Sequence, residues 1–323
     1  MRNFRDKIAV ITGAGTGMGR ELAIQLISEG CNLAICDILT DNLEETQVLC
    51  RDVATFGARV TIHTCDVAVE SQVVAFCDEV KDAHRTQCVN LLFNNAGIGG
   101  GHSFLLDERS VWDRTFAVNW FGVYYCSRAF MPMLTASDEG HLINTSSVNG
   151  FWANLGPSMP YTAYSAAKFA IKGFSEALLV DLRLNAPHVK VTLVMPGHIG
   201  TSIAVNAAKI HGTPSPEEMT SEQLSALRAR MIKSEKIDGQ VTNEELRNMM
   251  IVRQNSFRDD APMSATQAAT CILDAVRKGV WRVLVGKDAV FLDKFVRENP
   301  QDAYDPAFFS EVERGVGSEM FQT

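Results

Sequence analysis

The sequence predicts an α/β protein in which helices cover both faces of one parallel sheet. Short apolar segments alternate with longer helical patterns along nearly all of the 323-residue chain, as expected for repeated strand–helix–strand units. The short segments are apolar along their whole length, which is typical of strands buried on both faces. Seven segments fit this description: 7–12, 32–37, 59–66, 88–94, 140–146, 189–196 and 280–286.

Between these strands, apolar residues recur at helical spacing. The pattern predicts helices over 18–29, 108–135 and 161–186. No internal repeat, low-complexity tract or Pro/Ser-rich linker divides the chain, so we expect residues 1–323 to form a single domain.

Residues 203–263 interrupt the alternation before the last strand. This segment is polar and helix-prone, with candidate helix N-caps at Ser215 and Thr242. We expect a helical insertion that acts as a lid over substrate, although a subunit contact or a solvated hairpin without a role would give the same pattern. Residues 287–323 form a C-terminal extension whose role the sequence leaves open.

The composition excludes several classes of function. The net charge is −8 and no run of five or more like charges occurs, so neither a nucleic-acid nor an anionic-membrane surface is expected. The apolar run at 8–12 is too short for a signal peptide, and no run of about 18 apolar residues predicts a membrane span. The eight cysteines form no CxxC pair, which favours free thiols in a reducing, cytoplasmic compartment. No set of His, Cys or carboxylates has metal-ligand spacing, so no metal is expected.

A glycine-rich loop lies between the first strand and the first helix. Glycines allow a tight turn and a close approach of the backbone to phosphates, while free N–H groups at a helix N-terminus favour negative charge. We therefore predict a binding site for the pyrophosphate of a dinucleotide. The loop residues expected to contact it are Gly13, Gly15, Thr16, Gly17, Met18 and Gly19.

A carboxylate at the end of the second strand indicates which dinucleotide binds. Asp37 is placed to accept hydrogen bonds from both hydroxyls of the adenosine ribose and to repel a 2′-phosphate. Neither Thr16 nor Ile38 supplies the basic residue that a 2′-phosphate would need. The sequence therefore favours NAD(H) over NADP(H), with Asp37 and Ile38 at the adenosine end, unless Asp37 is only a strand-end turn former.

Tyr164 and Lys168 are placed for proton transfer. Their spacing puts both side chains on one face of the predicted helix. A free phenol has a pKa of about 10, and an ammonium about 4 Å away contributes on the order of 4 kcal/mol toward lowering it. Tyr161 is the weaker candidate, because Ser165 rather than a lysine lies one helical turn after it. Tyr164 is therefore the predicted general acid and base.

The glycine spacing GxxxGxG, followed by YxxxK, resembles the short-chain dehydrogenase/reductase family in its compact one-domain branch. The resemblance covers residues 5–201 densely and 262–286 loosely. It implies that 1–323 is one Rossmann-like NAD(P)-binding domain. It also implies that Ser147 orients the substrate oxygen and that Asn119 holds a water linking Lys168 to solvent. One departure is that the interval from Ser147 to Tyr164 is longer than is usual in the family.

The same resemblance assigns further residues to the cofactor. Residues after the third and fourth strands are implied to lie near the adenine and its ribose, and those after the sixth near the nicotinamide. Tyr164 and Lys168 are implied to hold the nicotinamide ribose, and Asn94 to stabilise the central sheet. The remaining implied cofactor contacts are Cys65, Asp66, Val67, Asn95, Ala96, Gly97, Pro196, Gly197, Ile199 and Thr201.

An apolar, aromatic pocket is expected around the site of hydride transfer. We expect Phe151, Trp152, Met159 and Tyr161 on one wall, and Ile98, Gly99 and His198 on the other, with Ser147 at the reacting oxygen. Phe151 and Trp152 could equally pack without touching substrate, and His198 could be a spectator. Such a pocket suits a hydrophobic secondary alcohol or ketone, such as a steroid, terpenoid or aryl compound. Arg228, Arg230 and Lys233 could supply a contact to a substrate carboxylate.

The function predicted is an NAD(H)-dependent oxidoreductase that interconverts such an alcohol and its ketone. Three alternatives remain: an NADP-dependent carbonyl reductase, a dinucleotide-binding regulatory or scaffolding protein, and a lyase or isomerase that keeps its NAD bound. Most relatives in the family are oligomers, so a homodimer or homotetramer built on 108–135 and 161–186 is expected. Trp112, Phe116, Trp120 and Phe121 suit that interface or the domain's own core.

Overall fold

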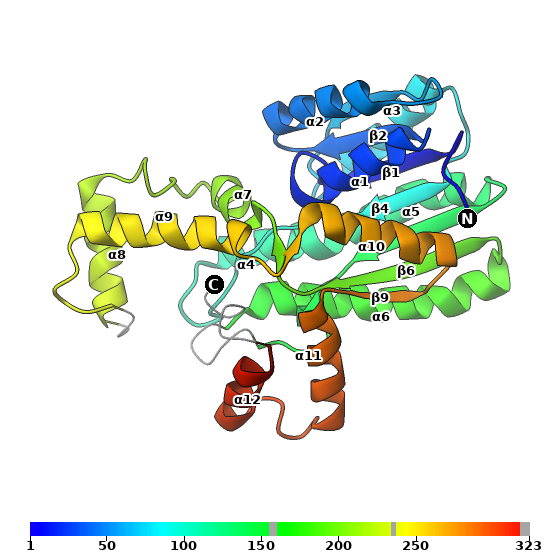
Figure 1. The fold of residues 1–323 in the computed structure, drawn as a ribbon. Coiled ribbons are helices and arrows are strands. Elements are labelled where there is room, and N and C mark those ends of the chain that lie inside the picture. The colour runs from blue at the N-terminus through cyan, green and yellow to red at the C-terminus, as the bar shows by residue number, and fades with distance from the viewer. Residues whose placement is uncertain (155–159, 234–236, 317–323) are drawn as a thin grey trace.

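A seven-stranded parallel sheet forms the centre of the molecule, in the order β3-β2-β1-β4-β5-β6-β9 (Figure 1). The structure is a computed structural model that describes residues 1–154, 160–233 and 237–316. The strands are β1 (Ile8–Thr12), β2 (Asn32–Asp37), β3 (Val60–Thr64), β4 (Leu91–Asn94), β5 (Gly140–Thr145), β6 (Val189–Pro196) and β9 (Arg282–Val285). All seven predicted strands are present, and the predicted fold class is confirmed. The order reverses at β1, which pairs with both β2 and β4, and ligands of such sheets bind beside this reversal.

Helices cover both faces of the sheet. Val10 and Ile11 are both fully buried, but Ile11 packs with residues of one set of helices and Val10 with residues of the other. This arrangement is why the strands are apolar along their whole length. One set comprises α1 (Gly17–Ser28), α2 (Thr40–Val53) and α10 (Ala265–Lys278), and the other comprises α3 (Glu70–His84), α5 (Gly122–Thr135) and α6 (Thr162–Asn185).

The helix predicted over 108–135 is interrupted. It consists of α4 (Arg109–Phe116), a π-helical stretch over Ala117–Phe121, and α5. Single π-helical turns inside α-helices often lie at functional sites, and this one contains Asn119. An extra residue in one turn shifts the phase of the apolar pattern by about 100°, which a short helical pattern does not distinguish from ordinary irregularity.

The insertion between β6 and β9 is helical and projects to one side of the sheet (Figure 1). It comprises α7 (Ile203–Ile210), α8 (Ser221–Lys233) and α9 (Asn243–Asp259). Two short strands, β7 (Ile199–Gly200) and β8 (Met263–Ser264), pair where the insertion leaves and rejoins the domain.

One of the two predicted helix caps is present. Thr242 and Glu245 form a reciprocal capping box at the start of α9. Ser215 instead bonds Glu218 in a turn, so its prediction as a helix cap is wrong. The cap before α8 is made by Thr220 and Gln223, whose side chains each bond the other's backbone N–H.

The C-terminal extension forms α11 (Lys287–Glu298) and α12 (Pro306–Val316), on a different side of the sheet from α8 and α9 (Figure 1). Its aromatic residues form a separate cluster with Trp152, which is fully buried. The eight cysteines are all free thiols; six are buried, and Cys88 and Cys271 are half-buried.

Candidate active site

The glycine segment after β1 is shaped so that larger residues at three of its glycines would be strained or would clash. Gly13 and Gly17 have φ of 65° and 56°, a region that glycine adopts readily. A Cβ on Gly13 would lie 2.6 Å from Cα of Ala96, and a Cβ on Gly19 would lie 2.2 Å from the Gly13 carbonyl oxygen. The loop therefore packs tightly against the end of β4 and leaves its cavity side open, which fits a bound pyrophosphate.

One cavity runs along the carboxyl ends of β1 to β4 and gathers most of the residues predicted to bind cofactor. The predicted residues that line it are Gly13, Thr16, Gly17, Met18, Asp37, Ile38, Cys65, Asp66, Val67, Asn95, Ala96, Gly97 and Thr201. Gly15 and Gly19 lie in the same loop but do not line the cavity. Pro196 and Ile199 line neither this cavity nor the one beside Tyr164.

Asp37 contacts the glycine loop as well as the cavity. Its carboxylate accepts hydrogen bonds from Gly15 N (2.8 Å) and Leu39 N (3.0 Å). Burial raises the pKa of Asp37 above its usual value, and the hydrogen bonds from Leu39 and Gly15 oppose that rise. Both interpretations of Asp37 are therefore compatible: it orders a turn and also presents a carboxylate to the cavity.

Two arginines near this cavity were missed by sequence reasoning. Arg20 donates to the Gly15 carbonyl (2.6 Å) and to Thr46 (3.0 Å), and so ties the loop to α2. Arg114 on α4 lines the cavity and pairs with Asp66 at 2.8 Å. Arg20 directly follows Gly19, so its position in the sequence could have indicated a contact with the glycine loop. Arg114 meets Asp66 only through the tertiary fold, which the sequence did not reveal.

The predicted catalytic residues meet where α6 begins beneath the end of β5. Tyr164 lies in the first turn of α6, and Lys168 Nζ is 5.3 Å from the centre of its ring. Lys168 Nζ also donates to the Thr145 carbonyl at 3.0 Å. Ser147 begins the short helical turn after β5 and forms a side-chain hydrogen bond with Tyr164. Ser147, Tyr164 and Lys168 are therefore brought together as predicted.

The ionisation of this pair differs from the prediction. Burial raises the pKa of Tyr164 to about 12, although the hydrogen bond with Ser147 opposes the rise. Burial also lowers the pKa of Lys168 from 10.5 to about 7. The sequence indicated a lowered pKa for Tyr164 because it shows the Lys168 charge and not the loss of water around both groups. At neutral pH the phenol is protonated and can donate.

Asn119 lies within reach of the same group. Its amide nitrogen donates to the carbonyls of Ile98 and Thr115, both at 2.8 Å, while its buried Oδ1 has no hydrogen-bond partner among the described residues. A Cβ on Gly97 would lie 2.8 Å from this oxygen and 3.5 Å from Lys168 Nζ. Gly97 therefore keeps open the space between Asn119 and Lys168, which is compatible with a bridging water.

A second cavity lies beside Tyr164. The predicted substrate residues Gly99, Ser147, Tyr161 and His198 line it together with Tyr164 and Gly197. The ring of Tyr161 stands edge-on to Tyr164 at 6.1 Å. This arrangement makes Tyr161 a wall of the cavity, as expected.

Phe151 and Trp152 do not line this cavity, contrary to prediction. Trp152 packs against Phe308 and Phe309, and its Nε1 donates to the Ala303 carbonyl at 2.7 Å. Phe151 packs between two clusters of the core. The C-terminal extension provides the apolar surface against which these rings pack. The sequence did not predict where that extension lies relative to them. Met159 lies outside the described residues.

His198 and Asp288 form a contact that the sequence did not predict. Asp288 Oδ2 accepts a hydrogen bond from His198 N at 2.6 Å, and His198 Nε2 lies 2.8 Å from the Phe257 carbonyl. Burial raises the pKa of Asp288, and the backbone N–H groups of His198 and Ala289 oppose that rise. A Cβ on Gly197 would lie 1.9 Å from this carboxylate, so Asp288 fixes the loop after β6.

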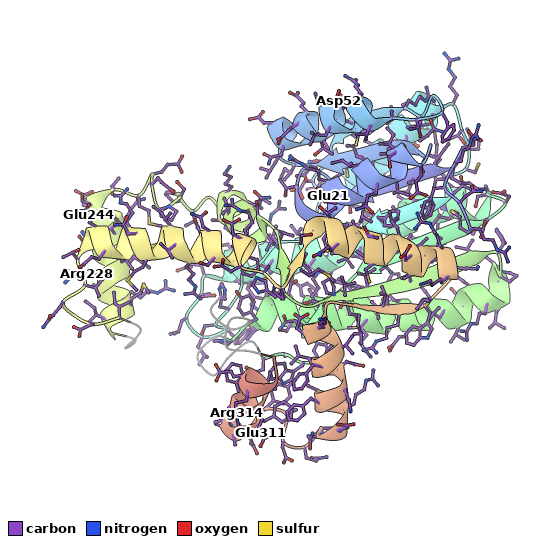
Figure 2. All side chains as sticks on the ribbon, viewed as in Figure 1. Glu21, Asp52, Arg228, Glu244, Glu311 and Arg314 are labelled. Carbon is purple, nitrogen blue, oxygen red and sulfur yellow. The ribbon has the colours of Figure 1, made fainter. Side chains whose placement is uncertain are left out.

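The insertion contacts both cavities. Ile203 of α7 lines both, and Asn206 donates to Thr16 Oγ1 at 2.8 Å. His211 Nε2 lies 3.0 Å from the Gly99 carbonyl. Arg228 is held by the Gly239 carbonyl at 2.9 Å and lies far from the sheet (Figure 2). Neither Arg228 nor Arg230 lines the cavity beside Tyr164, and the side chain of Lys233 lies outside the described part of the chain.

The described residues contain neither a grouping of metal ligands nor a membrane-spanning helix. In that part of the chain, no three His, Cys, Asp or Glu residues are grouped so as to hold a metal ion. None of the helices described is long and apolar enough to cross a membrane.

Comparisons with known proteins agree with this geometry. A sequence model of the short chain dehydrogenase family matches residues 7–210. A putative oxidoreductase, SadH of Mycobacterium tuberculosis, is 35% identical over 297 residues, which cover 92% of each chain. Epidermal retinol dehydrogenase 2 of Mus musculus is 34% identical over 203 residues, covering 62% of this chain and 63% of that protein.

Solved structures show the same fold. A short chain dehydrogenase/reductase from Burkholderia phymatum in complex with NAD has a TM-score of 0.71 at 28% identity, covering 95% of this chain and 98% of that chain. A metagenomic short-chain oxidoreductase in complex with NADP has a TM-score of 0.53 at 31% identity, covering 60% of this chain and 83% of that chain. This chain therefore belongs to the short-chain dehydrogenase/reductase family, whose members are oxidoreductases that bind a nicotinamide dinucleotide.

Proposed function

We propose that this protein is an NAD(H)-dependent oxidoreductase that interconverts a hydrophobic secondary alcohol and its ketone. The observation that carries the proposal is that Ser147 and Tyr164 line one cavity, which lies beside the dinucleotide site. Ile203, Ala204 and Phe257 give that cavity much of its apolar lining. A relative named as a retinol dehydrogenase supports an apolar alcohol as substrate class.

The residues around the first cavity fit a dinucleotide. The glycine loop would hold the pyrophosphate, Asp37 the adenosine ribose, and Asp66 with Val67 the adenine side. Lys168 and Tyr164 would hold the nicotinamide ribose, with Gly197 and Thr201 near the ring. When bound, the nicotinamide supplies the acceptor or donor of a hydride.

Preference for NAD(H) over NADP(H) is proposed from the charge around Asp37. Its carboxylate faces the place where a 2′-phosphate would sit and would repel it. Arg20 is the cation nearest in sequence to the loop, and its Nε and Nη2 donors are engaged with Gly15, Asn42, Glu45 and Thr46. It is therefore poorly placed to neutralise a phosphate. Related structures hold NAD in one case and NADP in another, so the argument depends on Asp37.

In ketone reduction, Ser147 donates a hydrogen bond that orients the substrate oxygen, and the Tyr164 hydroxyl gives that oxygen its proton. In alcohol oxidation Tyr164 takes the proton back. Lys168 lies behind Tyr164, where its ammonium stabilises the phenolate that forms, and Asn119 Oδ1 offers an acceptor for a water on the path to solvent.

A homodimer or homotetramer is proposed for the assembled protein. Phe121, Tyr124 and Phe169 on the predicted interface segments are each more than a third exposed, while Trp120 packs within the domain against Phe174. Exposed aromatic residues on neighbouring elements suit a subunit contact.

A substrate panel tests the function. NAD⁺ and NADP⁺ are each offered with steroid, terpenoid and aryl secondary alcohols, and formation of the reduced dinucleotide is followed by near-ultraviolet absorbance. We expect turnover of at least one apolar alcohol, and faster turnover with NAD⁺. Turnover confined to polar alcohols would contradict the substrate class, and equal rates with both dinucleotides would contradict the cofactor preference.

A further inference from the structure

The wall that α9 contributes to the substrate cavity carries one positive charge. Arg253, Gln254 and Phe257 line the cavity from adjacent turns of this helix. Among the described residues that line the cavity, Arg253 is the only arginine or lysine. The sequence had suggested other residues of the insertion as a contact for a substrate carboxylate, namely Arg228, Arg230 and Lys233.

Arg253 and Tyr161 line the same cavity. Burial raises the pKa of Tyr161, and the charge of Arg253 opposes that rise, so the guanidinium is near the Tyr161 phenol. The Tyr161 ring in turn stands edge-on to Tyr164 at 6.1 Å. Arg253 therefore shares one cavity with Tyr164 and with the Tyr161 ring that packs against it.

The same cavity also contains a carboxylate, that of Asp288. Asp288 is 3% exposed, and its carboxylate accepts the His198 N–H at 2.6 Å. Arg253 is exposed. A ligand in the cavity therefore meets a positive charge that water also reaches, and a negative charge already bound by backbone groups.

We propose that the substrate is an apolar alcohol or ketone that carries a carboxylate remote from the reacting carbon, and that Arg253 selects it. This inference rests on the proposed function and narrows its substrate class. A guanidinium matches a carboxylate with two parallel hydrogen bonds, which a neutral ester cannot accept with the same strength. The apolar lining holds the body of the substrate, Ser147 and Tyr164 hold its reacting oxygen, and Arg253 holds the anionic end.

The test compares phenyl keto acids, with methylene spacers of increasing length between ketone and carboxylate, against their methyl esters. For at least one spacer length we expect the KM of the acid to be about tenfold lower than that of its ester. R253Q should raise the KM of that acid about tenfold, leave the ester's KM nearly unchanged, and alter kcat little for either. R253K keeps the charge and should restore part of the preference.

R258Q is the matched control. Arg258 lies on the same helix, pairs with Asp259 at 2.7 Å, and does not line the cavity. Its substitution should leave the preference for acid over ester unchanged. Equal KM values for every acid and its ester in the unsubstituted protein would overturn the proposal, as would an R253Q protein that keeps the preference.

Binding to the NADH-loaded protein separates this proposal from the proposed function. If an acid binds more tightly than its ester, and R253Q abolishes the difference, Arg253 recognises the carboxylate even where no compound is turned over. In that case it is the oxidoreductase proposal that fails. If esters are turned over and bind as tightly as acids, the function stands and the role of Arg253 is refuted.

Discussion

Tyr164 and Lys168 illustrate how burial changes the chemistry of two side chains that a motif places together. The spacing on α6 was readable from the sequence, and so was the need for a cation near a phenol. The motif did not show that Lys168 is buried and Tyr164 half-buried, and the loss of water around each group disfavours its charged form. The result is a neutral phenol and a lysine with a pKa of about 7.

The lowered pKa of Lys168 predicts a stability that depends on pH. Between pH 7 and pH 10.5 the unfolded chain keeps the Lys168 proton while the folded protein releases it, so the free energy of unfolding rises with pH across this window. Below pH 7 the folded protein must bury the ammonium. Lys168→Met removes the free-energy cost of burying the ammonium, which is on the order of 4 kcal/mol. It also removes the hydrogen bond to the Thr145 carbonyl, and that loss does not depend on pH.

Denaturant unfolding of the cofactor-free protein and of Lys168→Met at several pH values measures this effect. The stability of the variant relative to the unsubstituted protein should fall steadily as pH rises through the window. A difference that does not change with pH would show that the ammonium is not desolvated.

Asp37 predicts the outcome of a cofactor comparison. In the unsubstituted protein, NADH should bind much more tightly than NADPH. Asp37→Ala should weaken NADH binding by about tenfold or more, because the ribose hydroxyls lose a charged acceptor, and should narrow the gap to NADPH. Asp41→Ala, an exposed carboxylate in the first turn of α2, is the control. Dissociation constants from NADH and NADPH fluorescence titrations decide the matter, and equal affinities before substitution would refute the role of Asp37.

At the scale of elements, local pattern predicted where strands and helices form but not which distant segments pack together. All seven strands and the helices over 18–29 and 161–186 follow from apolar periodicity. The contact between Trp152 and Ala303 joins residues 151 positions apart, and that between His198 and Asp288 joins residues 90 positions apart. Nothing local in the sequence specifies either pair, so the C-terminal extension was left without a role.

The extension supports the turn that follows Ser147, and Trp152 should be the main contact. Trp152→Ala should lower the free energy of unfolding by about 3 kcal/mol or more, because a fully buried indole is removed and a cavity remains. Trp281→Ala, at a site that is 41% exposed, should change it much less. Denaturant unfolding of both variants measures this difference, and similar small losses would mean that the extension packs only loosely.

The insertion bears on the cofactor as well as on the substrate, because α7 contacts the glycine loop. Asn206→Ala removes the hydrogen bond to Thr16 and should raise the dissociation constant of NADH several-fold, corresponding to about 1 kcal/mol. Asn255→Ala, on α9 and outside both cavities, is the control. An unchanged NADH affinity in Asn206→Ala would restrict the insertion to the substrate side.

For the molecule as a whole, the sequence predicted the dinucleotide side of the site better than the substrate side. The glycine loop, Asp37 and the residues after β3 and β4 follow strand ends that a parallel sheet brings to one edge. The substrate cavity is built from α9, α6, the loop after β6 and the start of α11. Their meeting depends on how the insertion and the extension fold back, which periodicity does not encode. Arg253 and Asp288 were missed for this reason.

The most direct test of the central claim is to compare Tyr164→Phe with Tyr161→Phe, measuring turnover and NADH binding for each. We expect Tyr164→Phe to lower kcat by about a hundredfold or more and to leave NADH binding nearly intact. Tyr161→Phe should retain turnover and alter mainly the KM. If Tyr164→Phe retains turnover while Tyr161→Phe loses it, the proton comes from Tyr161 and the catalytic assignment is wrong.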